Sequence, residues 1–181
     1  MSREWRALHP GESAGTRRRE IERAYESFLD NDLQALRRSS GHVRKIVLDS
    51  WRRSVDRAVD PEGRPTASVL NAHELRELRR IHPLAAALPV LERLLINEAA
   101  DSGFIVAVGD ARGRLLWVDG DHQLRGKAED IGFMAGTDWS ELSIGTSAPG
   151  SALALDHPIQ AFGAEHFNRA VHQWSCAATP V

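Results

Sequence analysis

The chain has 181 residues, 42% of them hydrophobic, which suits one compact domain with a helical extension and excludes several large domains. Its formal net charge of −2 excludes a general attraction to nucleic acid or to an anionic membrane, and no stretch offers the roughly 18 to 20 apolar residues of a membrane span. A single cysteine excludes an internal disulfide framework, so the composition indicates a cytoplasmic protein.

Two helices are predicted near the start of the chain. Residues 1–16 mix glycine, proline and serine with charges and predict a mobile or loosely docked leader, and residues 17–100 predict a helical segment. Its first helix covers residues 17–38, where apolar side chains recur at helical spacing. A second helix covers residues 43–59, and proline and glycine then mark a linker at residues 60–66.

The arginines of these two helices suggest nucleic-acid binding, since phosphate contacts need clustered cations. Acidic residues alternate with them from Glu20 to Asp56, which favours a solvated face of ion pairs. The connection between the helices also lacks the signature of a recognition helix. We therefore expect no direct nucleic-acid contact from this segment.

A third helical region begins at Asn71, an expected N-cap with Glu74 three residues later as in a capping box. Pro83 and Pro89 exclude one straight helix. A leucine-rich stripe follows the cap: Leu75, Leu78, Ile81, Leu84, Leu88, Leu91, Leu94 and Leu95. The stripe is richer than the edge helix of a monomer needs, so it either covers a sheet or serves an interface.

A β-hairpin is predicted next, from two short apolar runs at residues 103–109 and 114–119 with a turn between them. The glycines around this turn match neither the dinucleotide-binding nor the P-loop spacing, so we expect no nucleotide site. Residues 121–131 predict a short helix that Gly132 ends.

The stretch from Thr137 to Val181 is dense in aromatic, small and polar residues and poor in charge, a composition that suits the lining of a pocket. It predicts a loop to Ser143, a helix over residues 147–156 and a strand from Pro158. Its motifs follow one another as Trp139-Ser140-Glu141, Gly145-Thr146, Gly150-Ser151-Ala152-Leu153-Ala154, Glu165-His166-Phe167 and Trp174-Ser175-Cys176-Ala177-Ala178-Thr179-Pro180.

This series of motifs resembles the GAF-type sensor domain of bacterial transcription regulators of the acetoin-catabolism and dihydroxyacetone-kinase kind. The resemblance extends to residues 47–53, Asp60-Pro61 and residues 69–95, so it covers most of the chain after about residue 40. Two departures stand out. Family members usually carry Asn where Ser147 stands, and they continue beyond the position of Val181 into a turn and another strand.

The resemblance implies an α+β fold in which the N-terminal helical segment precedes, over residues 101–181, a GAF-like antiparallel sheet flanked by helices and lacking its final strands. It implies a ligand-sensing regulatory module that binds a small metabolite and signals through flanking helices of a homodimer. The last strand present would leave an open edge, so we expect dimerisation or partial disorder at the C-terminus.

Pockets in this fold lie between the sheet and the segments laid across it, so large or polar side chains of residues 133–176 are the candidate ligand contacts. They are Phe133, Trp139, Glu141, Thr146, Phe162, His166, Trp174 and Cys176. Three have structural alternatives. Trp139 also suits a core plug, Glu141 a cap, and His166 a loop fixed by a backbone hydrogen bond.

Three other functions compete with ligand sensing. A protein-interaction or dimerisation module would have a filled interior. A metal or haem sensor would use Cys176, His166 and His172, although this trio lacks the carboxylate or second cysteine that such sites favour. An enzyme would need a nucleophile elbow or a group to orient a Cys176–His166 pair, and the sequence offers neither. We expect no catalysis and no cofactor.

Overall fold

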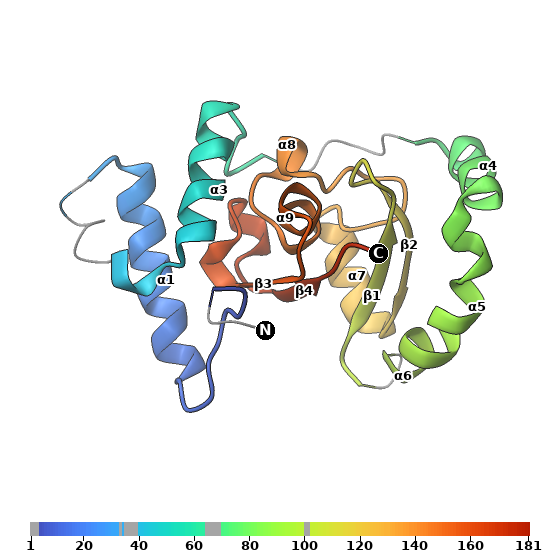
Figure 1. The fold of residues 1–181 in the computed structure, drawn as a ribbon, viewed down its shortest axis with the longest axis horizontal. Helices are drawn as coiled ribbons and strands as arrows, with labels where there is room; N and C mark the ends of the chain where they lie inside the picture. The colour runs from blue at the N-terminus through green and yellow to red at the C-terminus, as the bar shows by residue number, and fades with distance from the viewer. Residues whose placement is uncertain (1–3, 33, 35–39, 64–69, 100–101) are drawn as a thin grey trace. The chain divides into compact units, whose positions relative to one another are not determined.

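The computed structural model describes residues 4–32, 34, 40–63, 70–99 and 102–181 (Figure 1). They form an α+β protein, as predicted, with two separate antiparallel pairs of strands among the described residues. The chain divides into two compact units: unit 1 is Met1–Gly63 with Ser140–Val181, and unit 2 is Arg64–Trp139. Within the described part, no helix combines the length and apolar character that crossing a membrane requires. The domain boundaries at residues 16 and 100 stay a prediction.

The core of unit 1 joins its first two long helices to its C-terminal segment. α1 (Ala14–Leu29) buries Tyr25, and α3 (Lys45–Asp56) buries Trp51. The two rings meet edge to face with centroids 5.3 Å apart. The Tyr25 hydroxyl donates to the carbonyl of Phe167 at 2.5 Å, so this aromatic cluster ties both helices to the end of the chain.

α1 differs from the predicted helix at both ends. It begins at Ala14, where the Ser13 side chain accepts from Thr16 N at 3.4 Å. It ends at Leu29, since Asn31 adopts a φ of 55° and Asp32 N bonds back to the Ser27 carbonyl at 2.9 Å. The prediction that this helix runs to residue 38 is therefore wrong at its C-terminal end, and residues 35–39 lie outside the described residues.

The segment before α1 is docked on unit 1. Ala7 is 3% exposed, and its backbone N–H donates to the Gln160 side chain at 3.1 Å. The Trp5 carbonyl accepts from Gln160 N at 3.1 Å, and the Trp5 ring stacks on His157 at 3.7 Å. A leader without periodicity can thus be held by a sheet edge, which the pattern of its own residues does not reveal.

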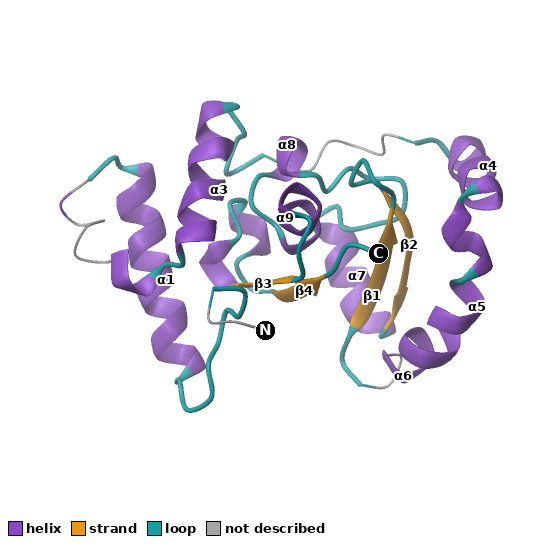
Figure 2. Cartoon of the chain, in the orientation of Figure 1, coloured by secondary structure: helices purple, strands orange, loops and turns teal. Residues whose placement is uncertain are grey.

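The C-terminal segment of unit 1 follows the predicted order with one addition. The predicted helix forms as α9 (Ala148–Leu155), capped by Ser147, and it packs against β3 (Ile159–Phe162) and β4 (Ser175–Ala178). β3 and β4 pair antiparallel. The stretch predicted as a loop to Ser143 also holds a short helix, α8 (Glu141–Ile144). Figure 2 shows these short elements separated by loops.

Unit 2 is built on the predicted hairpin, β1 (Ile105–Gly109) with β2 (Leu115–Gly120). α7 (His122–Asp130) packs against β2 on one side, and Figure 1 shows α4 (Ala72–Ile81), α5 (Leu88–Leu91) and α6 (Asn97–Ala99) on the other. The predicted capping box at the start of α4 is present: Asn71 accepts from Glu74 N at 3.0 Å, and the Glu74 carboxylate accepts from Asn71 N at 2.8 Å.

The leucine stripe covers the hairpin only in part. Arg79 of α4 donates from Nε to the Leu116 carbonyl at 2.5 Å. α4 nevertheless contributes no buried residue. Several large apolar side chains of the stripe region are exposed: Ile81 by 66%, Val90 by 48%, Leu94 by 59% and Leu95 by 48%. The stripe region therefore contacts β2 and also leaves several large apolar side chains of unit 2 exposed.

Candidate functional site

Glu141 and Thr146, two of the candidate residues, are engaged in a buried polar cluster on unit 1. Arg53 of α3 holds the Glu141 carboxylate in a bidentate pair, with Nε 2.9 Å from Oε2 and Nη2 2.7 Å from Oε1. Ser50 donates to the same carboxylate, and its hydroxyl lies 2.7 Å from that of Thr146. Glu141 is 4% exposed, and its hydrogen bond raises the pKa of Arg53. The cluster locks α3 to α8.

His166, another candidate, is fully enclosed and uses one ring nitrogen to hold its own loop. Its Nδ1 lies 2.9 Å from the Gly163 carbonyl, and the residue is 1% exposed. Burial lowers its pKa to about 4, so the neutral ring donates from Nδ1. Nε2 is buried and has no hydrogen-bond partner among the described residues. A hydroxyl or water that donates to Nε2 would satisfy this nitrogen.

Protonation of His166 is expected to make stability depend on pH. The pKa of His166 is about 4 in the folded protein and about 6.5 in the unfolded chain. Between pH 4 and pH 6.5, therefore, only the unfolded chain is protonated at this residue. Stability is complete above pH 6.5 and falls as the pH falls toward 4. We expect unfolding in urea at pH 5 to require about 2 kcal/mol less than at pH 7 on account of this group.

The control for this pH dependence is a residue that keeps the bond and cannot titrate. His166→Asn retains a donor near the position of Nδ1 and should lose this part of the slope, whereas His122→Gln, at an exposed position of α7, should keep it. Equal slopes in the wild type and His166→Asn would contradict the assignment.

The aromatic and thiol candidates are distributed over both units. In unit 2, Phe133 and Trp139 meet edge to face with centroids 4.6 Å apart, and Trp139 donates from Nε1 to the Gly132 carbonyl at 3.1 Å. In unit 1, Phe162 ends β3, and the Arg18 guanidinium lies 4.9 Å from its ring centre. Trp174 precedes β4, and Cys176 within it has its pKa raised to about 11 by burial.

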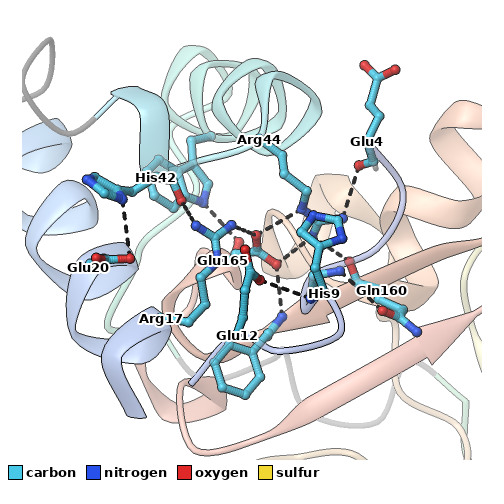
Figure 3. A network of polar contacts seen from close by, with 12 residues as sticks. Glu4, His9, Glu12, Arg17, Glu20, His42, Arg44, Gln160 and Glu165 are labelled. Carbon is cyan, nitrogen blue, oxygen red and sulfur yellow. Dashed lines mark hydrogen bonds and ion pairs between the residues drawn. The ribbon is translucent and has the colours of Figure 1, made fainter. Parts of the chain in front are cut away.

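A buried bidentate ion pair of unit 1 lies outside the eight candidates. Arg44, the residue before α3, donates from Nε to Oε1 of Glu165 at 2.9 Å and from Nη2 to Oε2 (Figure 3). Phe162 N donates to the same carboxylate at 3.1 Å, and the Glu165 carbonyl accepts from Trp51 Nε1 at 2.9 Å. The available sequence signal was that Glu165 is the last acid of the chain and stands among apolar and aromatic residues, because a buried carboxylate needs a partner.

Two open hollows lie on unit 1, and none of the eight candidates lines either. The larger, of about 570 Å³, is lined by Arg18, Glu22, Ala164, Arg169, His172 and Gln173. The smaller, of about 230 Å³, is lined by His9, Glu12, Arg17, Gly41, Val43 and Arg44. Among the described residues, no three His, Cys, Asp or Glu side chains are grouped as a metal site would need.

Comparison with known proteins gives consistent matches. Residues 18–181 match the family described as MimR, N-terminal domain. The chain is 46% identical over 180 residues to a 47.3 kDa protein of Rhodococcus erythropolis from the thcA 5′ region, covering 98% of this chain and 41% of that protein. It is 33% identical over 164 residues to the acetoin dehydrogenase operon transcriptional activator AcoR of Bacillus subtilis, covering 84% of this chain and 27% of AcoR.

Two further similarities concern an acetoin regulator and the fold. An acetoin catabolism regulatory protein of Cupriavidus necator is 30% identical over 138 residues, covering 75% of this chain and 21% of that protein. A chain in the crystal structure of the E. coli DhaR(N)–DhaL complex superimposes with a TM-score of 0.61 at 21% identity, over 75% of this chain and 47% of that one. The chain spans less than half the length of these relatives. The resemblance to sensor domains of such regulators is confirmed. The relatives whose function is known from their names are regulators of transcription and not enzymes.

Proposed function

The chain belongs to the MimR N-terminal domain family, and from this premise we propose that it is the signal-sensing segment of a bacterial transcription regulator and that its signal is a small metabolite. Two relatives with similar sequences are regulators of acetoin genes, which supports the proposal. A regulator of transcription works where the DNA is, so the proposal includes the cytoplasm. The homodimer implied by the resemblance to such regulators is part of the same proposal.

One observation carries the proposal: buried polar contacts bind the C-terminal segment of unit 1 to its two long helices. Glu141 is paired with Arg53 of α3, Glu165 is paired with Arg44 before α3, and the Phe167 carbonyl is bound by Tyr25 of α1. Breaking one partner of a buried pair is costly. When the segment around residues 141–167 moves, these contacts therefore move α1 and α3 with it. This coupling is the route that the proposal gives to a signal.

A metabolite can act as a signal only if it binds more tightly to one arrangement of these contacts than to another. The polar atoms of Glu141 and Thr146 are occupied within the protein, whereas Nε2 of His166 has no partner among the described residues. A metabolite that donates a hydroxyl to His166 would gain a hydrogen bond that the empty protein does not make. The metabolite can then shift the helices only to the extent that its affinities for the two arrangements differ.

The test is thermal unfolding with a panel of small polyols, acetoin and aromatic acids. A ligand at 100 times its Kd stabilises by about 2.7 kcal/mol, which corresponds to a rise in Tm of roughly 5 to 10 °C for a domain of this size. We expect at least one compound to do this, and His166→Asn to reduce its effect while His122→Gln does not. A flat response across the panel would contradict metabolite sensing.

A second candidate is a protein-interaction or dimerisation module. Its support is the exposure of large apolar side chains on unit 2, among them Ile81, Leu94 and Leu95, and the internal hydrogen bonds that Glu141 makes with Arg53 and Thr146 with Ser50. A flat response to the panel, together with a mass by light scattering that rises with concentration, would favour this candidate over the first.

A further inference from the structure

The leader of unit 1, residues 4–9, is held along one edge of β3. Gln160 N donates to the Trp5 carbonyl at 3.1 Å, and Ala7 N donates to the Gln160 side chain at 3.1 Å. Because consecutive backbone N–H groups of a strand point to opposite edges, the N–H of Ala161 faces β4, the partner strand. The leader therefore covers one edge of β3, and β4 covers the other.

The leader has a second anchor on the residue before α3. Arg44 donates from Nη1 to the Glu4 carbonyl at 3.2 Å and from Nη2 to the Gln160 carbonyl at 2.6 Å (Figure 3). The same guanidinium holds the Glu165 carboxylate. The leader thus spans two anchors, β3 and the start of α3. Since hydrogen bonds weaken steeply when their geometry is lost, both anchors are engaged only while these elements keep their present spacing.

A turn separates the leader from α1. Glu12 N donates to the His9 carbonyl at 3.1 Å, and Gly11 within this turn has a φ of 86°. Ala7 is the only buried residue of the leader. A segment that buries little apolar surface and ends at an exposed turn opens at a lower free energy than the core of the same unit.

We propose that the leader is a strap with two states, closed on β3 and Arg44 or released from both, and that it opens while the rest of unit 1 stays folded. Closure of the strap then depends on the spacing between β3 and the start of α3, because a shift of either element breaks one set of contacts. The strap is therefore a switch between order and release that these two elements control. The proposal does not depend on metabolite sensing at the candidate residues.

The experiment is amide hydrogen exchange of the whole chain, followed residue by residue by NMR in urea concentrations below the unfolding transition. We expect the Gln160 amide to be less protected than that of Ala161 and insensitive to urea, because opening a short strap exposes little surface. Trp5→Ala removes the stack on His157 and should speed exchange at Gln160 about tenfold. Arg6→Ala, at an exposed position of the strap, should leave this rate unchanged. Equal protection and equal urea dependence of Gln160 and Ala161 would overturn the proposal.

A conservative variant tests the second anchor. Arg44→Lys keeps a positive charge opposite Glu165, but an ammonium group cannot hold this carboxylate and the Glu4 carbonyl in the geometry of a guanidinium. We expect exchange at Gln160 to become about three- to tenfold faster and to stay insensitive to urea. Lys45→Arg, at the exposed neighbouring position, should leave the rate unchanged. An unchanged rate in Arg44→Lys would mean that Arg44 does not hold the strap and would overturn the proposal.

Discussion

Replacing Arg44 by alanine is expected to lower the free energy of unfolding by about 3–5 kcal/mol, the cost of stranding a buried charge. Arg44 is the bidentate partner of Glu165, whose side chain is 0% exposed. Arg17, at 3.7 Å, cannot replace it without moving. The measurement is the urea midpoint and slope at pH 7, followed by circular dichroism.

The neighbouring Lys45 provides a matched control. It also forms an ion pair, with Asp49, but its side chain is 81% exposed, so Lys45→Ala should cost less than about 1 kcal/mol. A double variant, Arg44→Met with Glu165→Gln, removes the stranded charge and keeps an acceptor for Phe162 N, so it should recover part of the loss. If Arg44→Ala costs no more than Lys45→Ala, the pair does not hold α3 to the C-terminal segment.

The second large effect is expected at Gly145, between α8 and α9. Its φ of 73° and ψ of −153° lie in a region that residues with a side chain rarely adopt. A Cβ at this position would lie 2.7 Å from the Cβ of Phe167, which is 1% exposed and packed in the core. Gly145→Ala should therefore cost about 3 kcal/mol or more, from backbone strain and overpacking together.

Gly126 in α7 is a position at which the same substitution should raise the free energy of unfolding instead of lowering it. A Cβ there meets no atom within 4 Å. Gly126→Ala should stabilise by about 0.5–1 kcal/mol, because alanine loses less backbone entropy in a helix. Both variants are measured by urea unfolding. Similar effects of the two substitutions would mean that Gly145 is not held in the strained conformation.

Elements governed by neighbouring residues could be predicted from the sequence. Asn71 with Glu74 predicted the start of α4, and Ser147 stands at the N-cap of the predicted α9. The hairpin followed from two apolar runs around a turn. These signals act over a few residues, so no tertiary information was required.

Features set by distant residues could not be predicted in the same way. Arg44 and Glu165 are 121 positions apart, and Tyr25 and Phe167 are 142 apart. Nothing in either local pattern identifies the partner. The early end of α1 depends on the left-handed conformation of Asn31, which helical periodicity alone does not reveal. The eight candidate residues were found by composition and resemblance, and their role as ligand contacts stays a proposal.

Hydrogen exchange in the presence of the panel compounds tests whether the C-terminal segment of unit 1 senses a metabolite and passes the signal to α1 and α3. We expect one compound to slow exchange in residues 141–167 and, in the same experiment, to change exchange in both helices. If every compound leaves exchange in residues 141–167 unchanged, or if a change there never reaches α1 and α3, the claim is contradicted.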